Sequence, residues 1–559
     1  MSRWIQVLAE AKASKLNLGG VLKMSLKVFL QLVGGIGMLI YGIKVMGDSL
    51  QNLAGDRLRR LIAKLTSTPV KGVLVGLAVT AIIQSSSATT VMIVSFVHAG
   101  LMTLYQAFGV IMGANIGTTV TAQIMAFKIT DLAYISVAIG AFVFLLAKNK
   151  RQREIGAGLA GFGVLFIGMH MMGDAMSFLK GRQDLFMPFR YHPLWAVLAG
   201  TAVTMVIQSS SATVGLTMAM AAQGFMPLNV AIAFIMGDNI GTTITAVLAS
   251  LGANRSAKQA ATCHVMFNVI GTLILLPFLP WYSEFISHTS SDISRQVANA
   301  HTLFNVGNTM LFLPFTRPFV NLVRRVVPDD GRAKVYGAAF LDRNLITASP
   351  AAALDALKKE MVRMAQFAKS MLEGCRVAIV DGSDLEAREV LNTEKIVNEL
   401  THEIVAYGTL IGQKGLSEDL SFILNSCING VGDIERMGDH ATNLVEMYEY
   451  MRDHNLKFSD QGIREFEEMF SLVHQAVAMS IEALDREDLD LANQVMALED
   501  RVDEMEKRLR ARHIDRLNHG KCSPGAGVVF IDILSNLERV GDHAHNLACV
   551  VMDLAKVRG

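Results

Sequence analysis

The sequence has few cysteines and no excess of charge of either sign. Its five cysteines are scattered along the chain and none forms a CxxC pair, which favours reduced structural thiols over a disulfide framework. Basic and acidic residues number 51 and 50, so the net charge is only +1. That balance gives no reason to expect a nucleic acid as partner. A compact secretory signal peptide is also lacking among the mixed polar residues 1–25.

Charged residues are scarce for most of the length and abundant only near the end. They make up 18% of the chain, against 51% hydrophobic residues, and the mean hydropathy is +0.37. The charges concentrate in roughly the last two hundred residues. At 559 residues the chain is too long for one core. We therefore expect a membrane part followed by a soluble part.

Two short motifs each occur twice with the same spacing. QSSSAT stands at 84–89 and again at 208–213, and 208 − 84 = 124. GANIGTT at 113–119 returns as GDNIGTT at 237–243, and 237 − 113 is again 124. A stretch of about fifty residues is therefore duplicated without insertion or deletion. Duplicated apolar segments with polar centres are the best sequence indication of a transporter's binding site.

Residues 26–326 are predicted to form a membrane domain. Most of its long apolar runs approach the length that crosses a bilayer: 26–47, 104–127, 131–147, 155–179, 228–252, 260–287 and 301–326. The apolar runs on either side of each QSSSAT have only about 13–14 residues. Because neither can span alone, each pair predicts a re-entrant hairpin with the serines at its tip.

The distribution of basic residues predicts how the membrane domain is oriented. Basic residues between two spans at 148–153 and after the last span at 324–325 place both positions in the cytoplasm. An odd number of crossings then separates corresponding points of the two copies. The copies, about 26–147 and 155–287, are therefore expected to be inverted repeats. This count places the lysine-rich leader, residues 1–25, outside, against the positive-inside rule, unless it lies along the membrane surface.

The serines at the two predicted tips are the candidate anion site. Hydroxyls and free backbone N–H groups at a helix break suit a tetrahedral oxyanion, and glutamine adds an amide donor. The alternative is that the serines only let helices pack closely in lipid. The candidate residues for binding this oxyanion are Gln84, Ser85, Ser86, Ser87, Gln208, Ser209, Ser210 and Ser211.

Neutral oxygens next to the glycines of the second motif suit Na⁺ coordination, although small-residue helix packing is the alternative. Asp238 stands where the first copy has Ala114; an intramembrane carboxylate indicates function, unless it lies near the membrane edge. The lone histidines at 98, 170, 264 and 301 are interpreted as packing residues. The candidate sodium-binding residues are Thr89, Asn115, Thr118, Thr119, Thr213, Asp238, Asn239, Thr242 and Thr243.

Residues 327–349 read as a linker, and 350–559 as a helical domain with apolar residues at three- and four-residue spacing. A third repeat there, ERMGDHATNL at 435–444 and ERVGDHAHNL at 538–547, suggests two three-helix units that form six helices. Its acidic residues, four apart, share a helical face and suit Mn or Fe, whereas a solvated charged face is the alternative. The candidate metal ligands are Glu435, Asp439, Asn443, Glu538, Asp542 and Asn546.

These motifs carry a resemblance to known families. QSSSAT with the downstream GANIGTT, twice, resembles type II sodium–phosphate cotransporters over about 26–326, and the ExxxDxxxN repeat resembles a PhoU-type domain over about 350–559. The resemblance to bacterial members implies an all-α protein of the inner membrane with a cytoplasmic bundle. It also implies phosphate as substrate, Na⁺ as driving ion, membrane lipid as surroundings, regulatory iron or manganese, and a homodimer.

The sequence therefore predicts a secondary active transporter that couples Na⁺ entry to phosphate uptake. One alternative is a phosphate exporter or relief valve gated by the PhoU-like domain. Another is a membrane sensor that binds phosphate and signals without transport, although a duplicated inverted site argues against it. An enzyme is least favoured, because the serines have no nearby histidine or aspartate of the kind that nucleophilic catalysis needs.

Overall fold

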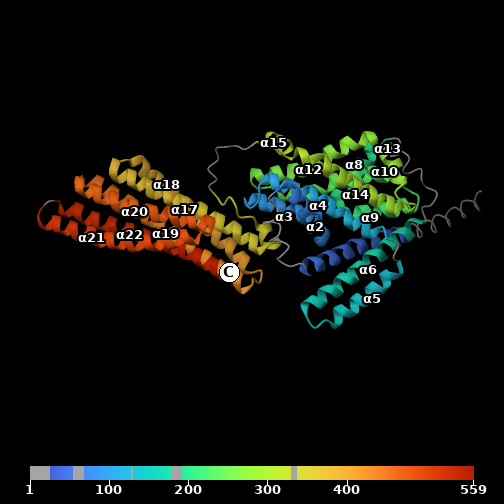
Figure 1. The fold of residues 1–559 in the computed structure, drawn as a ribbon, viewed down its shortest axis with the longest axis horizontal. Coiled ribbons are helices and arrows are strands. Elements are labelled where there is room, and N and C mark those ends of the chain that lie inside the picture. The colour runs from blue at the N-terminus through green and yellow to red at the C-terminus, as the bar shows by residue number, and fades with distance from the viewer. Residues whose placement is uncertain are drawn as a thin grey trace, which may run out of the picture. The chain divides into compact units, whose positions relative to one another are not determined.

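The computed structural model describes residues 26–53, 68–127, 130–177, 192–328, 337–520 and 522–558. Every secondary-structure element in these ranges is a helix, which confirms the all-α prediction (Figure 1). The chain divides into two units, Met1–His98 with Met102–Asp329, and Ala99–Leu101 with Asp330–Gly559. The predicted leader, 1–25, lies outside the described residues. The five cysteines are all free, as expected.

The first unit contains the apolar helices. Five of its described segments are long and apolar enough to cross a membrane: Leu26–Leu53, Leu104–Met125, Lys150–Ala175, Leu228–Ala249 and Arg255–Ser287. The numbered helices among its described residues are α2 (Pro69–Ile83), α3 (Ser86–His98), α4 (Leu104–Met125), α5 (Thr130–Leu146), α6 (Lys150–Ser177), α8 (Pro193–Ile207), α9 (Ser210–Ala222), α10 (Leu228–Thr242), α11 (Ile244–Ala249), α12 (Arg255–Leu275), α13 (Leu279–Ser287), α14 (Ile293–Phe312) and α15 (Thr316–Val326).

Both QSSSAT motifs lie at the turn between two short helices. In each copy the first arm has 15 residues and the second has 13. At 1.5 Å per residue the longer arm is about 22 Å long, which is less than the roughly 30 Å of a bilayer core. The arms end because Gln84 and Gln208 adopt left-handed backbone, with φ of 59° and 55°. The predicted re-entrant hairpins are therefore present.

Glycines hold the first arm of each hairpin against the following long helix. A Cβ on Gly113 of α4 would lie 2.0 Å from the Val73 carbonyl oxygen, and one on Gly237 of α10 would lie 1.9 Å from that of Val197. No side chain fits in such a space, so the backbones of α2 and α4, and of α8 and α10, touch directly.

The last two apolar runs are broken helices and contain another repeat. Each of α12 and α14 ends in a 3₁₀ turn, Leu276–Phe278 and Leu313–Phe315. The preceding sequences match as well, with His264 and His301 at equivalent positions, and 301 − 264 = 37. The motif analysis did not predict this additional duplication within the membrane domain. It places two related broken helices beside the duplicated hairpin units.

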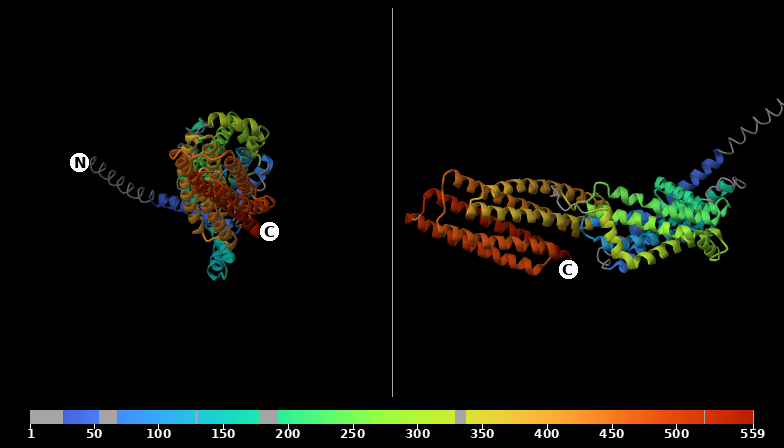
Figure 2. Two further views of the ribbon diagram at one scale, coloured as in Figure 1. Left: turned by 90° about the vertical axis from the view of Figure 1, so that its left-hand side faces the viewer. Right: turned by 90° about the horizontal axis from the view of Figure 1, so that it is seen from above.

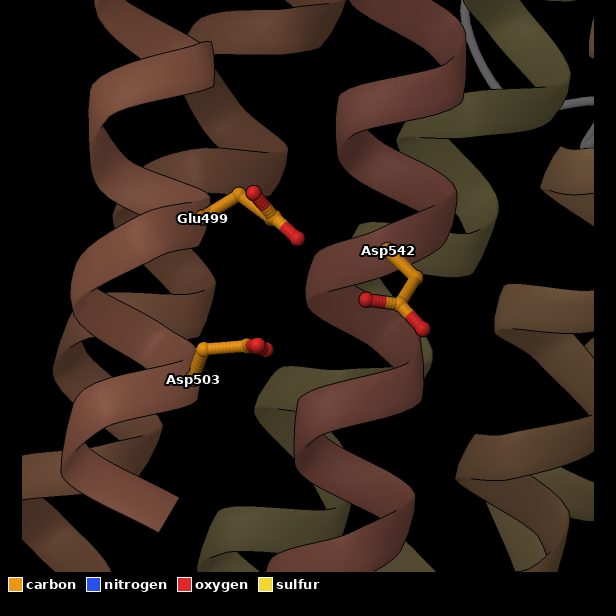
Figure 3. Close-up of side chains that lie close together, drawn as sticks. All are labelled: Glu499, Asp503 and Asp542. Atoms are coloured by element: carbon orange, nitrogen blue, oxygen red, sulfur yellow. The ribbon is translucent and has the colours of Figure 1, made fainter. Parts of the chain in front are cut away.

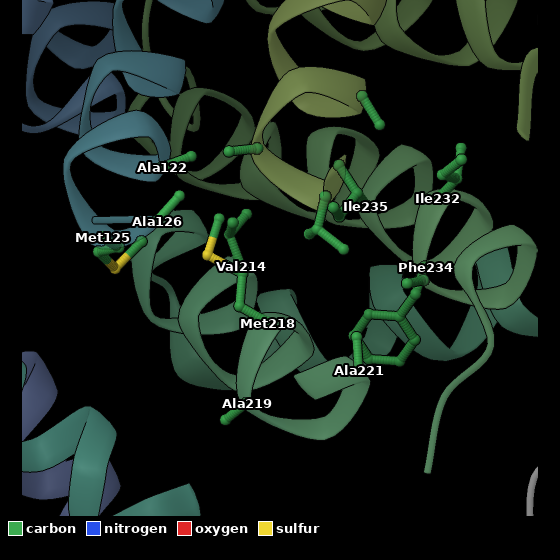
Figure 4. Packing of buried hydrophobic residues seen from close by; sticks show 14 of the residues in the cluster. Ala122, Met125, Ala126, Val214, Met218, Ala219, Ala221, Ile232, Phe234 and Ile235 are labelled. Carbon is green, nitrogen blue, oxygen red and sulfur yellow. The ribbon is translucent and has the colours of Figure 1, made fainter. Parts of the chain in front are cut away.

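Apolar packing joins the two copies of the hairpin unit. Figure 4 shows Met125 of α4 and the next residue, Ala126, close to Val214 and Met218 of α9, within one buried cluster that continues into α10. Because these side chains come from both repeats, the core of the first unit forms only when the repeats pack together.

The second unit is a bundle of long helices that run alongside one another (Figures 1 and 2). The six are α17 (Pro350–Asp381), α18 (Asp384–Gly412), α19 (Glu418–Asp453), α20 (Asp460–Arg486), α21 (Leu489–Asn518) and α22 (Pro524–Arg558). They match the predicted six-helix domain.

Residues 337–349 precede the bundle and lie within the stretch predicted as a linker. The short helix α16 (Arg343–Ala348) precedes α17. The backbone N–H groups of Ala339 and Phe340 both donate to the fully buried Glu360 carboxylate, at 2.8 Å. Residues 337–348 therefore belong structurally with the bundle.

Candidate functional site

The serines at the hairpin tips occupy two kinds of position. Ser85 and Ser209 stand directly before α3 and α9, and their hydroxyl oxygens accept from the backbone N–H of Ala88 and Ala212 at 3.2 and 3.3 Å. They are helix caps, and each hydroxyl proton remains free to donate. Ser86 and Ser210 begin the helices themselves and are buried.

The two tips differ in how their glutamines are placed. Gln84 is 6% exposed, and its Oε1 accepts from Thr121 Oγ1 on α4 at 2.8 Å. Gln208, at the equivalent position, is exposed. The predicted residues therefore lie together within each tip, but the glutamine of the first tip is bound to its long helix and that of the second is exposed.

A threonine pair closes each hairpin below its tip. Thr80 and Thr89 are joined by a 3.0 Å hydrogen bond between their hydroxyls, and Thr204 and Thr213 by one of the same length. All four threonines are buried. The predicted residues Thr89 and Thr213 are thus part of the contact between the two arms of each hairpin.

Asp238 adds a carboxylate to the threonine pair of the second copy. Its Oδ1 lies 2.7 Å from Thr204 Oγ1, and the whole residue is buried. Among the described residues its Oδ2 has no hydrogen-bond partner. The surrounding helices therefore shield this carboxylate from solvent. An unpaired buried carboxylate oxygen is a chemically suitable ligand for a cation.

The other predicted cation-binding threonines face their own helices. Thr118 and Thr242 donate to carbonyl oxygens one turn earlier, at 3.1 and 3.0 Å, and Thr119 and Thr243 donate to theirs at 2.7 Å. Each hydroxyl has used its proton and retains oxygen lone pairs. These hydroxyl oxygens therefore fit a cation, which needs oxygen lone pairs, better than an anion, which needs hydrogen-bond donors.

The asparagines of the second motif are bound by residues that the motif analysis did not select. Asn115 Nδ2 donates to Asn268 Oδ1 at 2.9 Å, and His264 Nε2 lies 3.2 Å from Asn115 Oδ1. In the second copy His301 Nε2 lies 3.4 Å from Asn239 Oδ1. Interpreting His264 and His301 as packing residues is therefore incomplete. The repeat with spacing 37 is the sequence signal that identifies them.

The other two histidines also have polar partners. His98 Nδ1 accepts from the backbone N–H of Asn254 at 3.0 Å. His170 lies 3.2 Å from Asp174, and both side chains are at least half exposed. Neither residue contacts the hairpin tips, so both remain outside the candidate site.

In the bundle, three carboxylates from two helices form a compact cluster. Glu499 and Asp503 of α21 face Asp542 of α22 (Figure 3), and one ligand oxygen from each lies within 4.8 Å of the others. Burial, followed by the charge of Asp503, raises the pKa of Asp542. Burial also raises the pKa of Glu538, with the charge of Asp542 as the next cause. Hard oxygen donors that repel one another fit a metal ion chemically.

The equivalent place in the other half is a pocket of about 460 Å³ lined by Glu394, Glu435 and Asp439. Burial, and then the charge of Asp439, raises the pKa of Glu435. The predicted acidic residues therefore do face neighbouring helices, α18 and α21. Those helices contribute Glu394, Glu499 and Asp503, which the sequence prediction does not include. The sequence EKIVNEL at 394–400 matches EDRVDEM at 499–505 weakly, and this match is the signal in the sequence that points to them.

The two asparagines predicted as metal ligands also contact the opposite half of the bundle. Asn443 Nδ2 donates to Asn536 Oδ1 at 3.1 Å, and Asn546 Nδ2 donates to Asp433 Oδ1 at 2.9 Å. His440 and His543 reach the same two acceptors, at 2.8 and 2.9 Å. Asn443 and Asn546 therefore join α19 to α22, although each retains a carboxamide oxygen.

Comparison with known proteins agrees with the predicted membrane domain and with the predicted helical domain. A family model described as Na⁺/Pi-cotransporter matches residues 38–174 and 178–281, and a PhoU domain model matches residues 361–447 and 466–551. Both copies of QSSSAT and of the asparagine motif lie inside the first match. Both carboxylate groups of the bundle lie inside the second.

Three relatives are similar over different parts of the chain. The putative inorganic phosphate export protein YjbB of Escherichia coli K12 is 24% identical over 94% of this chain and 97% of its own. The uncharacterized protein YqeW of Bacillus subtilis is 31% identical over 51% of this chain and 94% of its own. Sodium-dependent phosphate transport protein 2A of Rattus norvegicus is 42% identical over 18% of this chain and 16% of its own. The chain therefore belongs to the Na⁺/Pi-cotransporter family and carries a PhoU domain after its membrane domain.

Proposed function

We propose that this protein is a secondary active transporter that couples inward Na⁺ movement to the uptake of inorganic phosphate. The observation that carries the proposal is the duplicated hairpin tip, in which three serines follow a left-handed glutamine at the end of a helix too short to span the membrane. Non-helical backbone at membrane depth is tolerated only when it lines a cavity or is buried in protein. Two such tips supply a site that can face either side in turn.

Phosphate would be held by Gln84 and Ser85–Ser87 of one tip and Gln208 and Ser209–Ser211 of the other. Hydroxyl and backbone N–H donors suit its oxygens, and the start of a helix favours its negative charge. Na⁺ would bind first at nearby oxygens of Asn115, Asn239, Asp238 and the motif threonines. Its charge lowers the cost of moving a phosphate dianion out of water.

Uptake of radioactive phosphate into proteoliposomes with an imposed Na⁺ gradient tests this function, with a K⁺ gradient as control. Accumulation that needs Na⁺ supports cotransport. Equilibration without Na⁺, or phosphate binding without flux, contradicts it and favours a channel or a sensor.

Bulky variants then test the site. Ser86→Phe and Ser210→Phe should abolish uptake, because both serines are buried at the tips. Leu74→Phe, at a 62% exposed position on the first arm, is the matched control and should transport normally. Uptake at the wild-type level in both serine variants would contradict the assignment of the site to the tips.

Export is the second candidate, supported by the similarity to the putative phosphate export protein over nearly the whole chain. The two functions differ only in the direction of net flux under the cell's gradients. Phosphate efflux from preloaded cells that lack other phosphate carriers separates them. Efflux that rises with the protein and does not require reversal of the Na⁺ gradient would favour export.

The helical bundle is proposed to lie in the cytoplasm and to regulate transport through bound manganese or iron. The carboxylates that would hold the ions are Glu394, Glu435 and Asp439 in one half and Glu499, Asp503, Glu538 and Asp542 in the other. Support comes from the cluster of three carboxylates, in which burial raises the pKa of Glu499 and of Asp542. A homodimer in the lipid bilayer is likewise proposed, and mass measurement of the detergent-solubilised protein tests it.

A further inference from the structure

The asparagines at the two site motifs are each contacted by a histidine from the shorter repeat, on α12 for Asn115 and on α14 for Asn239. We propose that His264 with Asn268, and His301 with Asn305, are positioning residues that orient these two carboxamides. In this proposal either the Asn115–Asn268 hydrogen bond or the corresponding Asn239–Asn305 hydrogen bond is formed at one time. The first breaks and the second forms when access changes from one side of the membrane to the other. The inference rests on the transport function proposed above, because only a carrier needs the exchange.

In the first half the contacts are complete. Asn115 Nδ2 donates to Asn268 Oδ1 at 2.9 Å, and Asn268 Nδ2 donates to the His264 carbonyl oxygen at 3.0 Å. His264 Nε2 lies 3.2 Å from Asn115 Oδ1. Because that oxygen can only accept, the imidazole donates from Nε2. The carboxamide of Asn115 is thereby held at both its oxygen and its nitrogen.

In the second half one of these bonds is missing. His301 Nε2 lies 3.4 Å from Asn239 Oδ1, and Asn305 Nδ2 donates to the His301 carbonyl oxygen at 2.9 Å. Yet Asn239 Nδ2 and Asn305 Oδ1 have no hydrogen-bond partner among the described residues. These atoms are a donor and an acceptor at the positions that correspond to the bonded pair in the first half. Leaving both buried and unpaired is unfavourable by itself.

The two halves also differ at their glutamines and in the helix that follows each hairpin. Gln84 is bound to Thr121 of α4, whereas Gln208 is exposed. The helix α4 is continuous to Met125, whereas α10 ends at Thr242 and a separate α11 follows. The first half thus has the complete set of hydrogen bonds around its asparagine, and the second half lacks one of them. If each half alternates between two states, we expect to see the two equivalent sequences in different arrangements at one time.

Opposite shifts in two matched variants test the exchange. Asn268→Ala removes the bond present in this state, and Asn305→Ala removes the one expected in the other. The readout is maleimide labelling of Ala88→Cys and Ala212→Cys in detergent, in a background without native cysteines. These positions are equivalent, 212 − 88 = 124, but Ala88 is exposed and Ala212 is 2% exposed.

Asn268→Ala should label about fivefold faster at Ala212→Cys and slower at Ala88→Cys, as loss of one buried hydrogen bond predicts. Asn305→Ala should change both rates in the opposite direction, and the double variant should return towards the parent. Asn308→Ala is the control, because its carboxamide donates instead to the Phe267 carbonyl oxygen. It should leave the ratio of the two rates unchanged.

Shifts in the same direction, or unchanged rates in folded variants, would overturn the proposal. Size-exclusion chromatography establishes folding, and Asn268→Ser with Asn305→Ser replace any alanine variant that does not fold. Labelling is measured without phosphate flux. Failure of the exchange is therefore distinguishable from failure of the transport function, which the uptake assay tests separately.

Discussion

Asp238 is the residue that most clearly distinguishes the two copies of the site. It is fully buried, one of its oxygens contacts Thr204, and the other has no partner among the described residues. Position 114 in the first copy is alanine, although its threonine pair is the same. A buried carboxylate needs a compensating cation or proton. The second copy should therefore depend on a cation more strongly than the first.

Asp238→Asn should weaken the Na⁺ dependence of phosphate uptake. The amide keeps the size of the side chain but removes its charge. We expect the half-saturating Na⁺ concentration to rise roughly tenfold, since hydrogen bonds and contacts to charged groups contribute about 1.5–3 kcal/mol. Uptake at varied Na⁺ and fixed phosphate measures it.

Asp174→Asn is the matched control, because the Asp174 side chain is 67% exposed. It should leave the Na⁺ dependence unchanged. An Asp238→Asn protein with the parent's Na⁺ curve would show that the carboxylate is no part of the cation site.

Helix packing in the membrane unit depends on backbone contact at glycine. Gly113 and Gly237 each place α4 or α10 against the carbonyl of a hairpin arm, with no space for a methyl group. The arm and the long helix that follows it can therefore be expected to move together. Freedom of motion between halves would then lie at the contacts of α12 and α14 with the site asparagines.

Gly113→Ala should impair both folding and transport. Its Cβ would approach the Val73 carbonyl oxygen to 2.0 Å, and overpacking of this kind costs roughly 1–3 kcal/mol or more. The midpoint of thermal unfolding in detergent should fall, and uptake should fall with it. Gly307→Ala on α14 meets nothing within 4 Å and should behave like the parent. Equal effects of the two substitutions would contradict the packing argument.

The two units have separate cores and carry different chemistry. Among its described residues the membrane unit holds neutral oxygens and one buried carboxylate, whereas the bundle holds groups of carboxylates that repel one another. Because burial and neighbouring acids raise the pKa values of Glu435, Glu538 and Asp542, their charged forms are disfavoured in the folded bundle. A bound metal ion would relieve that repulsion.

Mn²⁺ should therefore stabilise the bundle without changing the membrane unit. At a concentration about a hundred times the dissociation constant, the unfolding midpoint of the bundle should rise by about 5 °C or more. Asp503→Asn should abolish this gain and raise the metal-free midpoint, because it removes one of three clustered charges. Calorimetry of the intact protein resolves the two transitions.

Asp515→Asn, whose side chain is 73% exposed, is the control and should keep the full Mn²⁺ effect. If Asp503→Asn retained the same gain, the three carboxylates would not be the metal site.

The amino-acid sequence by itself locates the hairpins and their tips, through the spacing of 124 residues and the short apolar runs. These features are local: a run of 13–15 residues cannot span a bilayer, and a repeated motif is visible in the letters alone. The six-helix bundle is likewise predictable from the period of its apolar residues. The Na⁺/Pi-cotransporter family model and the all-helical structure confirm the family and the fold. The individual site residues stay predictions.

Only the tertiary structure decides which partners the site residues have. Asn115 meets His264 and Asn268 across 149 and 153 residues, and Glu499 meets Asp542 across a turn between helices. Such contacts depend on how helices pack, which local periodicity leaves open. The same holds for the difference between Gln84 and Gln208. Identical sequences have different surroundings, because each half packs against a different part of the shared core.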